Sequence, residues 1–417
     1  MSDNDDFLLA QVRKSIQIAT GCTEPVAIAL NAATARKNAP GEIKRVQISM
    51  DEGLLKNALK VGIPGVSERG IEMCAALGLT VGNPDDGMNV LGDVPSDAEE
   101  RAKKLIPLVA VSIKKDCSDL FIETVLTTDQ SVVRVVTSKN HDHIALIEHP
   151  PFTEFTQEKD LDAERLKTFS LTKLKNFAES VDIEKIRFLK EGVDVNQRIA
   201  EKGLEMGFGR SLSQLSRSAL WGDSLVTYVQ SVTGAASFAR MSGVQMPVMI
   251  ATGSGNQGIT LFLTVATVAD KLLVSEEALL RALALALCVN LLSKAYLGAL
   301  APLCACGVAS GLGAAVGIVH LLGGNERQMT GVVRTMIGGL TGMICDGAKE
   351  GCANKVAISA TYAALSAMTA ASNFSIPSDN GILAEDVHSI FENLGYLSKE
   401  GMKNTNSAIL HIMNKNL

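Results

Sequence analysis

The chain has 417 residues, of which 47% are hydrophobic and 20% are charged, and its formal net charge is -6. This composition lies within the range of globular proteins and excludes an intrinsically disordered chain, while the length favours two domains. No block of Lys and Arg stands out, so the charge pattern argues against a nucleic-acid partner.

The first part of the chain, residues 5–38, predicts two helices that are broken at the segment TGCTEP, residues 20–25. Thr23 is the expected N-cap of the second helix, and Pro25 falls in its first turn, where a missing N–H costs nothing. Cys22 would then lie directly before a helix N-terminus.

The opening residues also bear on location. They are acidic and lack the basic and apolar regions of a secretory signal, so we expect a cytoplasmic protein. In a reducing compartment its eight cysteines would be free thiols that are available for metal binding or catalysis.

Residues 42–150 predict a small α+β domain. Short runs rich in β-branched residues alternate there with helical stretches near 53–60, 66–77 and 97–106. The predicted strands are residues 43–50, 109–114, 120–126, 132–137 and 143–147.

Beyond residue 160 the strand pattern nearly disappears and long helical patterns follow, separated by glycine-rich breaks. The abundance of Gly, Ala and Ser predicts helices that pack closely. Residues 295–319 carry no charge and are long enough to cross a bilayer, but Pro302 interrupts them and no aromatic belt flanks them. We therefore expect a buried helix and no membrane association.

A glycine-rich segment, TGSGNQG at residues 252–258, follows a short apolar run and precedes a helical pattern. It contains the GxGxxG spacing of dinucleotide-binding proteins, but no βαβ pattern surrounds it and no P-loop lysine is present. Backbone amides at a helix N-terminus favour a small anion such as a carboxylate, so we predict substrate binding by Ser254, Gly255, Asn256 and Gln257. A tight turn between helices is the structural alternative.

The cysteines suggest a metal site. Cys345 and Cys352 lie seven residues apart across a glycine-containing turn, Cys304 and Cys306 lie upstream, and Cys22 is a further candidate. Thiolates select iron–sulfur clusters or zinc, and this spacing lacks the paired CxxC elements of a zinc site.

Other cysteines and the histidines give weaker signals. Cys74 and Cys288 lie in apolar helical patterns and fit the alternative that a buried cysteine acts as a small hydrophobic residue. His141 and His143 flank Asp142 between two predicted strands, where we expect a solvated loop rather than a metal pair.

Together these motifs resemble a known family. The segments TGCTEP, TGSGNQGIT, Pro302-Leu303-Cys304 and MICDGAKEGCANK (343–355) are similar, in the same order, to those of the iron–sulfur L-cysteine desulfidases, which are relatives of the alpha chain of bacterial iron–sulfur L-serine dehydratase. The resemblance covers nearly the whole chain. The short loop between the last two cysteines favours the desulfidase branch.

The resemblance implies a 4Fe-4S cluster that is held by Cys304, Cys345 and Cys352, with one iron free for substrate. Cys306 is the rival of Cys304 as a ligand. Cys22 is then the expected catalytic base or an alternative ligand, and its place before a helix N-terminus would lower its pKa.

The expected activity is elimination of sulfide from L-cysteine, giving pyruvate, ammonia and hydrogen sulfide. The alternatives are an L-serine or L-threonine dehydratase, or a non-catalytic cluster or zinc protein. We expect a mostly α catalytic domain of residues 1–40 and 160–417 with an inserted α+β domain of residues 41–159. The partner is a small amino-acid substrate, and a homodimer is one open alternative for the assembly.

Overall fold

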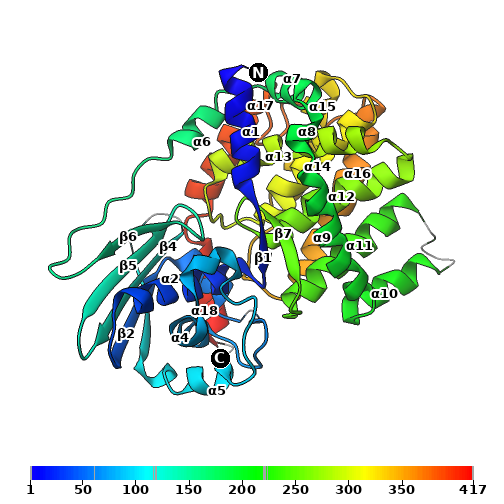
Figure 1. The fold of residues 1–417 in the computed structure, drawn as a ribbon. Helices are drawn as coiled ribbons and strands as arrows, with labels where there is room; N and C mark the ends of the chain where they lie inside the picture. Colours follow the sequence, from blue (N-terminus) through cyan, green and yellow to red (C-terminus); the bar gives the residue numbers. More distant parts are fainter. Residues whose placement is uncertain are drawn as a thin grey trace.

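The computed structural model describes residues 2–415 except residues 61, 116, 118–119, 219–221 and 223. The described chain is mostly α-helical, with one mixed β-sheet and one short β-ribbon. The sheet lies on one side of the molecule and most of the helices lie on the other (Figure 1). The predicted fold class, mostly α with a smaller α+β part, is confirmed.

The mixed sheet has five strands in the order β3-β2-β4-β5-β6, in which β2 and β3 are parallel and the other pairs are antiparallel. On β2 the side chains of Val46, Ile48 and Met50 are buried and alternate with more exposed residues, so one face of this strand is covered. The strands are β2 (Ile43–Met50), β3 (Val109–Ile113), β4 (Phe121–Thr128), β5 (Val132–Ser138) and β6 (Ile144–Glu148).

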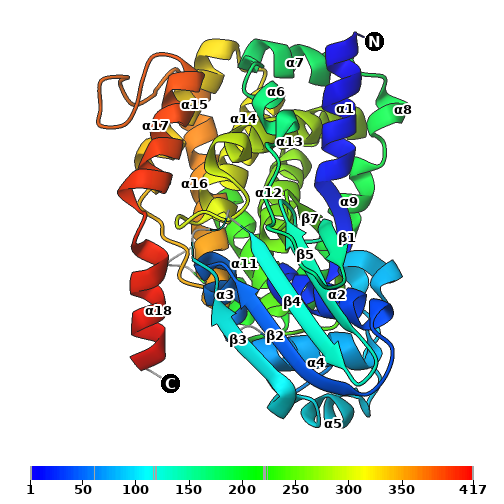
Figure 2. The same ribbon diagram turned by 90° about the vertical axis from the view of Figure 1, so that its left-hand side faces the viewer.

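Helices α2 and α4 pack on each other beside the sheet, and α2 contacts β4 and β5 (Figure 2). Helix α2 is buried from Thr23 to Ala35, which is unusual for a helix on the edge of a domain. Its core cluster joins the sheet to residues of the helical part such as Val232 and Ile250. The helical elements of this region are α2 (Thr23–Asn38), α3 (Glu52–Ala58), α4 (Ile71–Val81), η1 (Pro84–Asn89), α5 (Ala98–Lys103) and η2 (Ile106–Leu108).

The helical part surrounds α13, whose residues are mostly buried. Its elements are α6 (Leu161–Leu166), α7 (Leu171–Ser180), α8 (Ile183–Ile186), α9 (Leu189–Leu204), α10 (Gly207–Ser216), α11 (Leu225–Met241), α12 (Gly255–Leu272), α13 (Glu276–Leu297), η3 (Cys306–Ser310), α14 (Gly311–Leu321), α15 (Glu326–Leu340), α16 (Cys352–Ala371), α17 (Val387–Tyr396), η4 (Leu397–Gly401) and α18 (Thr405–Lys415). Among the described helices, α13 alone is long and apolar enough to span a membrane by length and composition, and 72% of its apolar window is buried inside the protein.

Small residues let these helices approach closely, as the composition predicts. A Cβ atom on Gly203 of α9 would lie 2.0 Å from the carbonyl oxygen of Ala235 on α11. A Cβ atom on Gly313 of α14 would lie 2.4 Å from the carbonyl oxygen of Ala286 on α13. Larger side chains at these glycines would force the helix pairs apart.

Two strands were not expected from the sequence. After α1 (Asp3–Ser15) the chain forms β1 (Ile16–Thr20), which pairs antiparallel with β7 (Pro247–Ala251). The prediction of two helices in residues 5–38 is therefore wrong for residues 16–20, and a strand does occur beyond residue 160. The ribbon brings the N-terminal segment beside the glycine-rich segment that follows β7.

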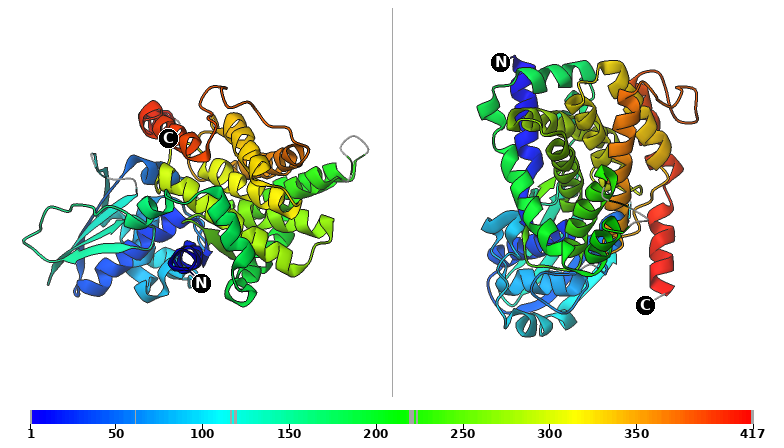
Figure 3. Two further views of the ribbon diagram at one scale, coloured as in Figure 1. Left: turned by 90° about the horizontal axis from the view of Figure 1, so that it is seen from above. Right: turned by 90° about the vertical axis from the view of Figure 1, so that its right-hand side faces the viewer.

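The two parts of the molecule are joined again at the C-terminus. Helix α18 returns from the helical part to contact α3, and it lies at the outer side of the molecule (Figure 3). Lys56 of α3 donates a hydrogen bond to the side-chain oxygen of Asn406, at 2.8 Å, and another to the carbonyl oxygen of Cys345, at 2.6 Å. The buried side chain of Lys56 therefore connects α3 with α18 and with the segment around Cys345, which are distant from it in the sequence.

Candidate active site

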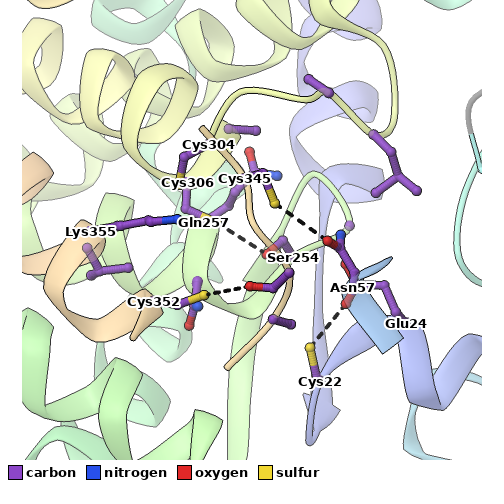
Figure 4. Close-up of a pocket in the computed structure, with 18 of the residues that line it drawn as sticks. Cys22, Glu24, Asn57, Ser254, Gln257, Cys304, Cys306, Cys345, Cys352 and Lys355 are labelled. Carbon is purple, nitrogen blue, oxygen red and sulfur yellow. Dashed lines mark hydrogen bonds between the residues drawn. The ribbon is translucent and has the colours of Figure 1, made fainter. Parts of the chain in front are cut away.

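One pocket lies where the sheet region, the ribbon and the helical part meet. It is lined by five cysteines from three separate segments, by the glycine-rich segment and by polar residues of α2, α3 and α11 (Figure 4). The cysteines are Cys22, Cys304, Cys306, Cys345 and Cys352, and all are free thiols. Ser254, Asn256 and Gln257 also line it, whereas Gly255 is not among the lining residues.

Direct backbone pairing positions Cys304 and Cys345. Leu303 and Ile344 form an antiparallel bridge, in which the Cys304 amide donates to Met343 at 2.7 Å and the Cys345 amide donates to Pro302 at 2.7 Å. The two cysteines therefore occupy diagonal positions on one face of the bridge, a relation that spans roughly 7–8 Å in a regular sheet. Such a separation exceeds the usual span of a disulfide.

Cys352 reaches the same pocket from the first turn of α16, where its thiol donates to the carbonyl oxygen of Gly347 at 3.5 Å. Gly347 adopts a φ of 98°, which only glycine adopts without strain, so this residue makes the turn between Cys345 and Cys352. Lys355, one turn further along α16, lines the pocket as a nearby cation.

These thiols fit an iron–sulfur cluster. Burial raises the pKa of Cys345, and burial raises the pKa of Cys352 to about 12, so ionised thiolates at these positions need a positively charged partner. Among the described residues no three His, Cys, Asp or Glu side chains converge on a single ion. Cysteine thiolates are the usual ligands of a 4Fe-4S cluster, and Cys304, Cys345 and Cys352 all line this pocket.

The pKa values of Cys304 and Cys306 are shifted in opposite directions. A hydrogen bond from Cys306 lowers the pKa of Cys304 to about 7, whereas the same interaction and burial raise the pKa of Cys306 well above its ordinary value. The Cys306 thiol also lies 3.7 Å from the hydroxyl oxygen of Ser254. The choice of Cys304 over Cys306 as a ligand stays a prediction.

Cys22 lies beside Glu24 at the start of α2, where Cys22 rather than Thr23 is the N-cap (Figure 4). Its thiol donates to Oε2 of Glu24 at 3.1 Å. Burial and the carboxylate of Glu24 raise the pKa of Cys22 well above its ordinary value. The prediction of a lowered pKa was wrong, because burial and Glu24 outweigh the lowering by Arg240.

Glu24 is a buried carboxylate at the centre of a hydrogen-bond network. Burial raises its pKa, but His141, the hydrogen bond from Cys22 and Arg240 outweigh burial and leave the pKa of Glu24 below its ordinary value. Asn57 donates to Oε1 of Glu24 at 2.9 Å and accepts from the thiol of Cys345 at 3.5 Å. Asn57 thus links the carboxylate of Glu24 to the thiol of Cys345.

The position of His141 differs from the expected solvated loop. Asp142 and His143 are exposed, but His141 is buried, lines the pocket and has an Nε2 atom without a hydrogen-bond partner. Its Nδ1 atom lies 3.0 Å from the position of a Cβ atom on Gly253, so only glycine there leaves room for the imidazole. The expected solvated loop therefore turns one side chain inward.

The glycine-rich segment forms a tight turn from β7 into α12. Ala251 and Ser254 exchange backbone hydrogen bonds of 3.1 and 3.0 Å, and Ser254 is the N-cap of α12 without a side-chain capping bond. Gln257 accepts hydrogen bonds from Thr252 and from Ser310, which brace the turn. The ribbon partner of β7 is β1, so the surroundings are not those of a dinucleotide fold.

Sequence reasoning identified the cysteines and this segment but missed Glu24, Asn57, His141 and Arg240. Glu24 stands inside the TGCTEP segment, and a glutamate directly before an apolar helix was an available signal. Asn57 and Arg240 lie in ordinary helical patterns, in which no local feature marks them.

Comparisons with known proteins identify the family. The profile of the family described as serine dehydratase alpha chain matches residues 85–411. A UPF0597 protein of Clostridium tetani is 37% identical, with 98% of this chain and 99% of the relative covered. A UPF0597 protein of Caldanaerobacter subterraneus is 36% identical, with 99% of each chain covered. The match extends over most of the chain and includes all the cysteines of the pocket except Cys22, so this chain belongs to the serine dehydratase alpha chain family.

Proposed function

We propose that this protein is a lyase that eliminates the β-substituent of a small L-amino acid, with L-cysteine as its substrate and pyruvate, ammonia and hydrogen sulfide as products. The observation that carries the proposal is the pocket itself, in which free thiols, a buried carboxylate and the start of α12 face one cavity. Membership of the serine dehydratase alpha chain family supports the same class of reaction.

In this proposal Cys304, Cys345 and Cys352 hold a 4Fe-4S cluster. When bound, such a cluster with one iron free of protein thiolate supplies a Lewis acid for the leaving group. Asn57 and Lys56 fix the Cys345 segment through the thiol and the carbonyl oxygen of that residue. These contacts keep the thiol turned toward the pocket before a cluster is present.

Cys22 and Glu24 provide the base that elimination requires. The thiol of Cys22 passes its proton to the carboxylate of Glu24, along the hydrogen bond that joins them, in the same step in which its sulfur takes the α-proton. In that step the Cα–H electron pair forms the new double bond, and the β-substituent leaves with its own bonding pair. The resulting enamine tautomerises and hydrolyses to pyruvate and ammonia.

Product analysis of anaerobically prepared protein tests this proposal. We expect equal amounts of pyruvate, ammonia and sulfide from L-cysteine, and a lower kcat/KM for L-serine and L-threonine. D-cysteine, which presents its α-proton on the other face, is the matched control and should give no sulfide. A higher kcat/KM for L-serine would replace the desulfidase with the dehydratase. Absence of any 2-oxo acid from the three L-amino acids would contradict the lyase.

A further inference from the structure

Arg240, in the last turn of α11, is a buried cation that forms no direct ion pair within the described part of the chain. Its side chain lines the pocket, and the residue is only 3% exposed. Nη1 donates to the side-chain oxygen of Asn256 at 3.2 Å and contacts the sulfur of Met241 at 3.4 Å. Nε and Nη2 are buried and have no hydrogen-bond partner, and no ion pair joins Arg240 to an acid of the described chain.

Burying a guanidinium with two unpartnered nitrogens costs free energy unless a ligand accepts hydrogen bonds from them. A buried charge with unsatisfied N–H groups loses hydration that the attraction between Arg240 and Glu24 replaces only in part. The nearby carboxylate, Glu24, already accepts hydrogen bonds from Cys22, Thr23 and Asn57. The two free nitrogens lie on one edge of the guanidinium, which is the edge that binds a carboxylate through two parallel hydrogen bonds.

The guanidinium also packs against the N-terminus of α12. A Cβ atom on Gly255, the first residue of this helix, would lie 2.3 Å from Nε and 2.9 Å from Nη2 of Arg240. The helix has 18 residues and no side-chain cap, so its first amides and its dipole also favour an anion. The unpartnered guanidinium and the start of α12 therefore attract negative charge to the same side of the pocket.

We propose that Arg240, together with the amides at the start of α12, binds the α-carboxylate of the amino-acid substrate. This inference rests on the proposed function and assigns the residue that orients the substrate. Asn256 and Ser237 are positioning residues, because the side-chain oxygen of Asn256 accepts from Ser237 at 3.1 Å and from Arg240. Asn256 therefore holds the guanidinium instead of contacting the carboxylate directly.

The position of Arg240 in the pocket is consistent with the proposed elimination. Met241, the neighbour of Arg240, packs against Cys22, with Cys352 beside them. A carboxylate on the guanidinium edge would place the α-carbon near the thiol of Cys22 and the β-substituent toward the cysteines of the cluster site. The carboxylate contact thus selects amino acids over simple thiols or amines.

The test compares two ligands that cannot undergo elimination. L-alanine keeps the carboxylate, whereas L-alaninamide replaces it with a neutral amide. Calorimetric titration of the cluster-loaded wild type should show about 100-fold tighter binding of L-alanine, since a charged bidentate contact is lost with the amide. Arg240→Met should weaken L-alanine binding by about 100-fold and leave L-alaninamide binding within about threefold.

Further variants make the test specific. Arg240→Lys keeps the charge without the planar fork and should recover about tenfold of the lost affinity. Asn256→Ala should weaken L-alanine binding by about tenfold, because the guanidinium loses its brace. Arg210→Met, a change at an exposed arginine, should match the wild type.

Two results would overturn the assignment: equal affinity of the wild type for both ligands, or an Arg240→Met protein that still prefers L-alanine. The first comparison uses only the wild type, so a misfolded variant does not block the decision. Failure of the proposed function is a separate outcome, in which no amino acid is turned over although L-alanine binding still depends on Arg240.

Discussion

Glu24 and Cys22 form the part of the pocket in which proton transfer is expected. Glu24 holds its charge in a buried site because Thr23 and Asn57 donate to it as well as Cys22. We therefore expect the proposed proton transfer to require both the carboxylate and the thiol.

Substitutions at this pair should stop the reaction and leave the metal site intact. We expect Cys22→Ala and Glu24→Gln each to lower kcat for L-cysteine by about 10²–10⁴-fold, the usual contribution of a positioned base, with unchanged iron content. Stopped assays of sulfide release, together with iron analysis of the same samples, measure both quantities.

Cys288→Ala is the matched control for that pair. Cys288 is a buried cysteine of α13 outside the pocket, so its substitution should leave kcat near the wild-type value. Full activity of Glu24→Gln would show that the carboxylate is not needed to ionise the thiol.

At the residue scale the sequence predicted the thiols better than the groups that surround them. Cys345 and Cys352 are separated by a recognisable turn, so local spacing revealed them. Arg240 and Asn57 reach the pocket only because α11 and α3 end there, and this is a consequence of tertiary packing that no local pattern encodes.

At the element scale the turn from β7 into α12 is the feature on which the proposed substrate binding depends. Each glycine of the GxGxxG spacing has a distinct role here. Gly253 has a φ of 80° and leaves room for His141, Gly255 leaves room for Arg240, and Gly258 packs against β7.

Gly258→Ala tests the packing of this element. A Cβ atom there would lie 2.0 Å from the carbonyl oxygen of Met249, so α12 must shift away from β7. We expect the free energy of unfolding to fall by about 1–3 kcal/mol, measured by urea denaturation.

Gly342→Ala is the comparison for Gly258→Ala, because no atom lies within 4 Å of a Cβ at that glycine. It should change the free energy of unfolding by no more than about 0.5 kcal/mol. Equal stability of the two variants would contradict the close approach of α12 to β7.

Both strands of the ribbon escaped prediction for physical reasons. β7 is a short apolar run, which periodicity cannot distinguish from a buried helix. β1 has only five residues and follows α1 without a break, so its sequence pattern cannot be separated from that of the helix. The ribbon is stabilised by pairing between segments that are distant in sequence, and one strand alone gives no sign of its partner.

At the scale of the whole molecule, α2 lies between the two predicted domains. The boundary at residue 40 assigned this helix to the helical part, but it packs on α4 and on the sheet and shares their core cluster. Its burial on all sides explains why no amphipathic pattern indicated its partners. The fold class follows from composition and periodicity, whereas the arrangement around α2 depends on tertiary contacts.

The account depends above all on a cluster held by Cys304, Cys345 and Cys352, so metal analysis of anaerobically purified protein tests it most directly. We predict about four irons and about four acid-labile sulfides per chain in the wild type, and loss of both when any of these three cysteines is replaced by Ala. Cys22→Ala should stay brown and keep its iron. Zinc without sulfide in the wild type, or a colourless Cys22→Ala beside a brown Cys352→Ala, would contradict the account.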